Sequence, residues 1–256
     1  MNGIGHRRNS LFLVWLIWFG VLLFAVAFVW QRGLFALLLQ GDPSYLSGVI
    51  LGAFALANLH VARRTLSLSR DIDAALRVRS NFEAHPDEPL FAEQGPQFRN
   101  QAVPPSLIMR HFQNLFVRAM REPSGHDLGQ RELLEALTLR LKSGIHGGWL
   151  VADTMLKLGL LGTVIGFIVM LGAIASLENY DLTTMQGLLT SMSGGMRIAL
   201  YTTLSGMTAA LLLAVQYQYL ERRADGLIAD IEELTAVYYV SALRRHLDKR
   251  QPDHAP

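Results

Sequence analysis

Four long runs without Asp, Glu, Lys or Arg dominate the pattern of apolar and polar positions in this chain. A helix crosses the hydrocarbon core of a bilayer in roughly 17–25 residues, and each run reaches that length. The pattern therefore predicts four transmembrane helices, over Leu11–Trp30, Tyr45–Ala62, Leu158–Leu177 and Ile198–Leu220.

The placement of basic residues predicts the orientation of these helices. Pairs of arginines stand at 7–8, before the first run, at 63–64, after the second, and at 222–223, after the fourth. The two short connections carry one arginine each, Arg32 and Arg197. Because loops rich in lysine and arginine stay in the cytoplasm, both chain termini and the long loop after the second run are expected to be cytoplasmic.

The long loop has the sequence pattern of a small helical domain. Residues 63–81 continue the second run as a helix, and the proline-rich stretch His85–Pro105 is expected to be irregular. Apolar residues recur at helical spacing in Ser106–Arg121 and again in Asp127–Ile145. The loop is therefore predicted to fold as helix, break and two further helices.

Two glycine-containing stretches stand near the predicted membrane surfaces. Gly144, Gly147 and Gly148 lead the chain into the membrane at Trp149, a residue type typical of the interface. On the other side, Met185–Met196 combines methionines with glycines and is predicted to be an outer loop.

The residues that follow the fourth run form an apolar seam with alternating spacings of three and four. Such a seam is typical of helices that pack along their length. It fits either self-association between neighbouring subunits or packing against the loop helices of the same chain. The seam consists of Leu220, Ala224, Leu227, Ile231, Leu234, Tyr238 and Ser241.

Composition excludes several classes of protein. The chain has 256 residues, of which 51% are hydrophobic and 17% charged, so it is too apolar for an ordinary soluble domain. A net charge of +2 gives no reason to expect nucleic-acid binding, and the absence of cysteine excludes disulfides and thiolate metal sites. No metal-ligand spacing, nucleophile elbow or phosphate loop is present, so neither an enzyme nor a cofactor or metal is expected. The loop histidines are His85, His111, His126 and His146.

The third and fourth runs each combine hydroxyl groups with small residues that let helices approach closely. Two such helices with inward hydroxyls can line a narrow polar path, which indicates ion movement. Each feature alone also fits ordinary helix packing, or a threonine bonded to its own backbone. The residues are Thr163 with Gly159, Gly162 and Gly166, and Thr202 and Thr203 with Ala199, Gly206 and Ala210.

The predicted spans contain no aspartate or glutamate. A proton relay inside a membrane needs a carboxylate or a histidine. His60 stands near the inner end of the second span, where it is expected to be an interfacial residue. Asp153 and Lys157 stand one turn apart at the cytoplasmic start of the third span, where they are expected to form an interfacial ion pair. A partner helix would therefore have to supply the carboxylate.

Two segments carry a resemblance to a known family. The octet Gly159–Gly166, reading GLLGTVIG, resembles the first pore helix of the MotA/TolQ/ExbB proton-channel family. Gly195–Gly206 is similar to that family's second pore helix, in which a threonine stands three residues before a glycine. The resemblance covers about Trp149–Leu220. The four-span layout resembles MotA and the ZorA defence motor, and the pore pair is more similar to TolQ and ExbB.

The resemblance implies a subunit of a proton-driven motor stator or energy-transducing complex in the bacterial inner membrane. Five copies would surround a dimer of a single-span partner similar to MotB, TolR or ExbD, and each partner helix would bring an essential aspartate. Thr163 and Thr203 match the two pore threonines. TolQ and ExbB carry a glutamate five residues before the second threonine, where this chain has Ile198 beside Arg197. The pore prolines of MotA have no counterpart, which leaves the subfamily open.

Together these inferences describe an all-α polytopic membrane protein with four transmembrane helices, a helical cytoplasmic domain and a C-terminal cytoplasmic helix. The expected division is 1–62, 63–148, 149–220 and 221–256. The alternative is a structural membrane scaffold of the same fold that does not transport ions. A neighbouring gene for a single-span protein with a membrane aspartate would favour the motor.

Overall fold

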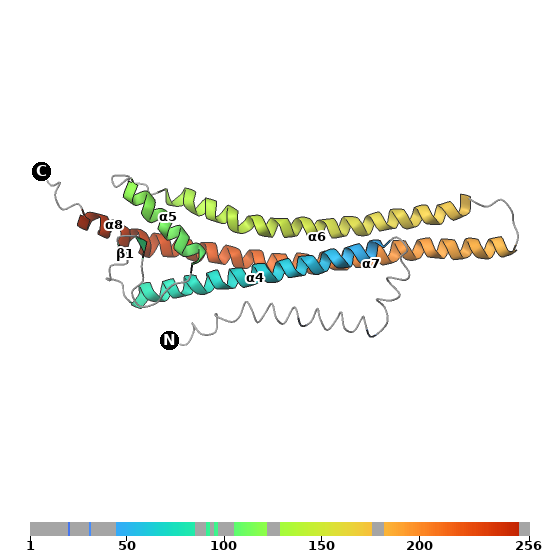
Figure 1. Ribbon diagram of the computed structural model, residues 1–256, viewed down its shortest axis with the longest axis horizontal. Helices are drawn as coiled ribbons and strands as arrows, with labels where there is room; N and C mark the ends of the chain where they lie inside the picture. Colours follow the sequence, from blue (N-terminus) through green and yellow to red (C-terminus); the bar gives the residue numbers. More distant parts are fainter. Residues whose placement is uncertain are drawn as a thin grey trace. The chain divides into compact units, whose positions relative to one another are not determined.

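The computed structural model of the chain describes residues 45–84, 91–92, 95–96, 105–121, 129–175 and 182–250, together with Gly20 and Gln31. This part is helical apart from one short antiparallel hairpin (Figure 1). The elements are α4 (Leu46–Ala84), β1 (Phe91–Ala92), β2 (Gly95–Pro96), α5 (Leu107–Arg121), α6 (Gln130–Ala175), α7 (Leu182–Leu234), the π-helical turn η1 (Thr235–Tyr239) and α8 (Val240–Arg250).

Three stretches of helix in the described residues are long and apolar enough to cross a membrane. They are Leu46–Ala84, Gln130–Ile174 and Met185–Arg245, which overlap the second and third predicted spans and contain the fourth. The protein is therefore a helical multi-pass membrane protein. The first predicted span, Leu11–Trp30, lies outside the described residues except for Gly20.

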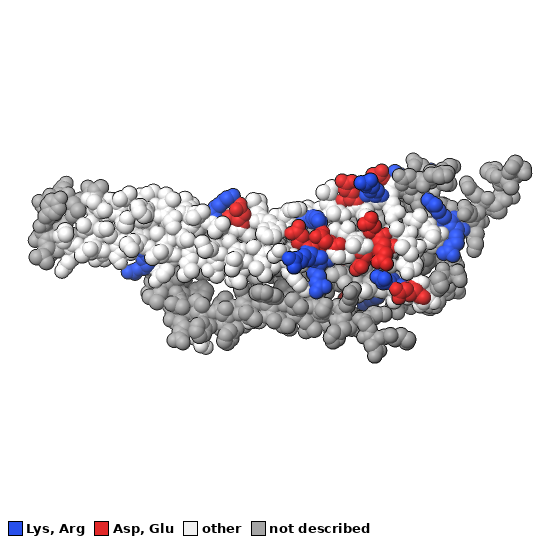
Figure 2. All heavy atoms as spheres, turned by 180° about the vertical axis from the view of Figure 1, so that it is seen from behind, with Lys and Arg blue, Asp and Glu red and all other residues white. Residues whose placement is uncertain are grey.

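The chain divides into two compact units, and charge distinguishes them. The polar unit comprises the described residues of Thr65–Ile145 and Leu220–Pro256, and the apolar unit those of Asn9–Arg64 and His146–Tyr219. Charged side chains gather over the polar unit and are sparse elsewhere on the face shown (Figure 2). The acidic and basic residues described in the apolar unit are Arg63, Arg64, Asp153, Lys157 and Arg197.

Two glycine-containing stretches lie within continuous helix. Helix α6 passes through Gly144, Gly147 and Gly148 without a break, and α7 begins at Leu182. The prediction of an outer loop over Met185–Met196 is therefore wrong. Glycine weakens a helix in water, but an unpaired backbone group is costlier in a membrane, so the helical hydrogen bonds persist.

The C-terminal seam packs inside its own chain. Leu220, Ala224, Leu227, Ile231 and Leu234 are all buried among the described residues. The segment that carries the seam contacts three helices of the polar unit: Phe82 of α4 stacks on Tyr238, Lys142 of α6 pairs with Asp225 at 2.8 Å, and Phe112 of α5 stacks on Tyr239. This confirms packing against the chain's own helices and leaves these side chains unavailable for a neighbouring subunit.

A one-residue insertion displaces the end of the seam. Tyr238 is only partly buried and Ser241 is exposed, whereas Tyr239 and Leu243 are 0% exposed. The π-helical turn η1 holds one more residue than an α-turn, and it therefore moves the buried face by one position. The prediction that Tyr238 and Ser241 continue the seam is wrong for this reason.

Tyr239 joins the C-terminal helix to α5. Its ring stacks on Phe112 with centroids 4.0 Å apart, and its hydroxyl donates to the Phe112 carbonyl oxygen at 2.7 Å. Burial raises the pKa of this phenol, which therefore stays protonated. The backbone N–H of Leu107, at the start of α5, donates to Asp71 of α4 at 3.1 Å. Helix α5 is thus held at its first residue and at its centre.

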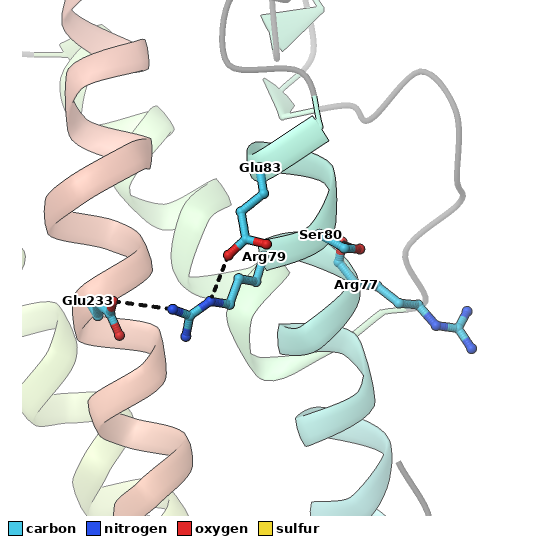
Figure 3. Close-up of polar contacts among 5 residues, drawn as sticks. All are labelled: Arg77, Arg79, Ser80, Glu83 and Glu233. Atoms are coloured by element: carbon cyan, nitrogen blue, oxygen red, sulfur yellow. Dashed lines mark hydrogen bonds and ion pairs between the residues drawn. The ribbon is translucent and has the colours of Figure 1, made fainter. Parts of the chain in front are cut away.

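Surface ion pairs also join helices of the polar unit. Arg79 of α4 donates to Glu83 at 3.1 Å and pairs with Glu233 of α7 at 3.6 Å (Figure 3). The hydrogen bond that the guanidinium donates to Glu83 and the charge of Glu233 raise the pKa of Arg79. Exposed pairs of this kind contribute little stability, about 0–1 kcal/mol each, so the apolar seam dominates.

Deletion of Ala236, an exposed residue of η1, tests the insertion. The π-helical turn should become a regular α-turn that keeps Tyr239 and Leu243 in the core, so the thermal unfolding temperature should change little. Deletion of Ala229, an exposed residue of α7, is the control. It rotates the following residues by about 100° and removes Ile231 and Leu234 from the core. Each of these burials is worth roughly 1.5–3 kcal/mol. Equal destabilisation by the two deletions would contradict the insertion.

His111 should make the polar unit sensitive to acid. Its side chain is 2% exposed, Nε2 has no hydrogen-bond partner among the described residues, and burial lowers its pKa from 6.5 to about 4. Between these values the unfolded chain binds the proton and the folded chain does not, so stability falls as the pH falls. At about 1.4 kcal/mol per pH unit, the loss approaches about 3 kcal/mol.

Unfolding of the His111→Phe variant, measured from pH 7 to pH 4, should lack this component of the acid dependence. His146→Gln, at an exposed position, is the control and should keep the wild-type slope. An unchanged slope in His111→Phe would contradict the assignment.

Candidate ion-path helices

Helices α6 and α7 of the apolar unit pack as an antiparallel pair along a row of small residues. Gly148 lies against Tyr217, Gly159 against Gly206, Gly166 against Ala199, and Met170 against Gly195. In each pair the two residue numbers add up to 365. Residue n of α6 therefore lies beside residue 365 − n of α7 through the whole contact.

The glycines let the two backbones touch. A Cβ atom placed on Gly206 would lie 2.7 Å from the Met155 carbonyl oxygen and 2.8 Å from Gly159 Cα. One placed on Gly166 would lie 2.5 Å from the Gly195 carbonyl oxygen. Atoms of the main chain cannot move aside, so a larger residue at these positions must separate the helices.

Gly162 faces a side chain rather than a main chain, namely the buried side chain of Thr202. A Cβ atom on Gly162 would overlap this threonine, which is 0% exposed. The Thr202 hydroxyl donates to the Ile198 carbonyl oxygen of its own helix at 2.8 Å. In the single chain, Thr202 therefore fills the space that Gly162 leaves.

The other two threonines are partly exposed. Thr203 donates across the helix contact to the Gly159 carbonyl oxygen at 3.1 Å, and Thr163 donates to Leu160 of its own helix at 2.5 Å. Because 163 and 203 add up to 366, the two hydroxyls stand at the same level of the helix pair. Each oxygen keeps lone pairs that can accept a hydrogen bond from water or a partner.

The structure adds small residues that the sequence analysis did not single out. Gly195 contacts α6. Ala209 is buried, whereas Ala210, the residue predicted to pack in the pore helix, is partly exposed. Ala199 contacts Gly166 as a small residue. The spacing of three and four residues along α7 could have identified Ala209 as a contact residue. The buried positions with this spacing are Ile198, Thr202, Gly206, Ala209 and Leu213.

Helix α4 contacts the pair through polar side chains. Gln216 of α7 donates to Asn58 of α4 at 3.1 Å, and Asn58 donates to the Phe54 carbonyl oxygen at 2.9 Å. Figure 1 shows α4 running in the same direction as α7. Asn58, Gln216, Tyr217 and Gly148 therefore mark one level of the apolar unit.

The register shows that two predicted spans are displaced. Residues 158–175 of α6 lie beside residues 190–207 of α7, whereas the predicted fourth span, Ile198–Leu220, lies beside residues 145–167 of α6. The offset is about 10 residues, or roughly 15 Å at 1.5 Å per residue. One flat bilayer core of about 30 Å cannot centre on both.

The matching region of a known family coincides with these helices. The model of the MotA/TolQ/ExbB proton channel family matches residues 106–233, half of the chain, from the start of α5 almost to the end of α7. The chain belongs to this family. Comparison with curated proteins gives no match. The family assignment confirms the resemblance carried by the sequence around Thr163 and Thr203.

Substitution of two glycines on α7 should have opposite effects. Alanine is about 1 kcal/mol more favourable than glycine inside a helix. Gly194→Ala has open space around it and should raise the unfolding temperature of the detergent-solubilised protein. Gly206→Ala meets the backbone of α6 and should lower it. Stabilisation by both substitutions would contradict the close approach.

Proposed function

We propose that this chain is a ring-forming subunit of an ion-driven motor or energy-transducing complex in the bacterial inner membrane. Its proton-channel family and the paired hydroxyls of Thr163 and Thr203 at one level of α6 and α7 support this proposal. Five copies would surround a dimer of a single-span partner similar to MotB, TolR or ExbD. Both termini and the polar unit would be cytoplasmic.

The exposed surface of the apolar unit supports assembly into a ring. Large apolar side chains of α6, such as Leu160, Val164 and Phe167, and of α7, such as Leu200 and Leu204, are more than half exposed in the single chain. These surfaces need lipid or protein around them. A ring would place one face of the helix pair toward the partner and the other against the next subunit.

The threonines would have different functions in such a ring. Thr163 and Thr203 would line the path, because their partly exposed hydroxyls can hydrate a partner carboxylate. Thr202, also predicted to line the path, is 0% exposed, and we assign it to helix packing with Gly162. Gly159, Gly166, Ala199 and Gly206 would hold the path-lining helices together.

Proton flux through the chain and its partner, co-purified and reconstituted in liposomes, tests this function. Thr163→Val and Thr203→Val keep the side-chain shape but remove the hydroxyl, so each should reduce flux. Thr203→Ser should retain it. Thr208→Val, at an exposed position on α7, is the control. The mass of the complex should show five copies in every variant.

Two outcomes would contradict the proposal. A stable monomer in detergent would exclude the ring. Normal flux in both valine variants would show that the threonines do not line the path. A ring that binds the partner but conducts no protons would instead favour the transport-inactive scaffold.

A further inference from the structure

An ion pair on α6 lies on the surface that α7 leaves open. Lys157 donates to Asp153 one turn earlier, and the two side chains are 70% and 50% exposed. The residues of α6 that contact α7, Gly148, Gly159 and Gly166, occupy another face. The sequence predicts this pair at the membrane surface. The register between the helices of the apolar unit gives the distance of the pair from the level of Arg63.

The depth follows from the level shared by Gly148, Tyr217 and Asn58. Arg63 lies five residues beyond Asn58 in one direction, and Asp153 lies five residues beyond Gly148 in the other, because α6 runs antiparallel to α7 (Figure 1). At about 1.5 Å per residue, Asp153 is roughly 15 Å and Lys157 roughly 21 Å from the level of Arg63.

Arg197 marks the opposite side. It precedes Tyr217 by 20 residues, which places it roughly 37 Å from the level of Arg63. A bilayer has a hydrocarbon core of about 30 Å and a full thickness of about 40–45 Å. Both arginines can therefore reach the head groups at once, and the Asp153–Lys157 pair then lies near the middle of the membrane.

The other placement is worse electrostatically. If Asp153 and Lys157 stood at the membrane surface, Arg197 would lie roughly 16 Å above Lys157, near the middle of the hydrocarbon core. Arg197 makes no ion pair among the described residues. Burying an unpaired arginine at that depth costs much more free energy than burying an aspartate–lysine ion pair, whose net charge is zero. The charges of the apolar unit thus favour the placement with the pair inside.

We propose that Asp153 is an intramembrane carboxylate of the ion path, supplied by this chain in addition to any partner carboxylate, with Lys157 as its counter-ion. This inference rests on the proposed function. Lipid cannot solvate an exposed ion pair, so the face that carries it must meet protein or water. In a ring, that face would border the path between the level of Arg63 and the level of Thr163.

The proposed step is a proton relay. The Asp153 carboxylate accepts a proton from water or from the partner, and the resulting carboxylic acid releases that proton to the next acceptor toward the level of Arg63. No other bond changes. Lys157 is a positioning residue, which holds the carboxylate in place through the ion pair.

Paired neutralisation tests the relay without leaving a lone charge in the membrane. Asp153→Asn combined with Lys157→Met should reduce proton flux about tenfold or more, with the mass of the complex unchanged. Asp153→Glu keeps the carboxylate and should retain flux. The control is Arg79→Met with Glu83→Gln, an exposed pair of the same spacing in the polar unit. This control should leave flux unchanged.

Unchanged flux in the Asp153→Asn, Lys157→Met variant would overturn the relay and leave the pair a packing feature. If that variant does not assemble, the exchange Asp153→Lys with Lys157→Asp keeps the pair but moves the carboxylate by one turn. Reduced flux in the exchanged chain supports the relay, and normal flux overturns it. A wild-type complex without flux would contradict the proposed function itself, so the two failures are distinguishable.

Discussion

The close approach of α6 and α7 is the contact on which the rest of the apolar unit depends. Glycine on both helices brings backbone against backbone at Gly159 and Gly206, and no side chain can slide into the gap. Contacts of this kind replace the hydrophobic effect as the force that pairs helices in lipid. They also fix the register, because a shift of one residue would bring a Cβ atom into the opposite main chain.

A fixed register turns sequence positions into depths. Thr163 and Thr203 come to one level because both helices are held at Gly159 and Gly166. The same register places Asp153 roughly 15 Å from the level of Arg63. The glycine contacts between α6 and α7 thus determine which polar groups lie at the same level. Electrostatics then determines only how deep the helix pair sits in the membrane.

The sequence predicted this organisation where local patterns are decisive. Uncharged runs located three described membrane helices, and the Gly159–Gly166 octet identified the family. Register between helices was not predictable, because it depends on which glycine of α7 faces which glycine of α6. The third and fourth predicted spans are therefore offset from each other by about 10 residues along the helix pair, because the charged residues that bound each span do not report its register with the other helix. The loop predicted at Met185–Met196 failed for a related reason. Glycines needed for contact, such as Gly195, have the same sequence pattern as glycines in loops.

The polar unit shows the same limit in a helix that is not in lipid. A strict alternation of three and four places Tyr238 on the seam, but the π-helical turn gives this place to Tyr239. Tyr239 stacks on the Phe112 ring and donates a hydrogen bond to the Phe112 carbonyl oxygen. If Tyr238 took this position instead, it would lose its stacking contact with Phe82. Two aromatic contacts in adjacent positions are both satisfied only if the helix widens by one residue. The irregularity is therefore set by tertiary packing, and heptad spacing alone cannot predict it.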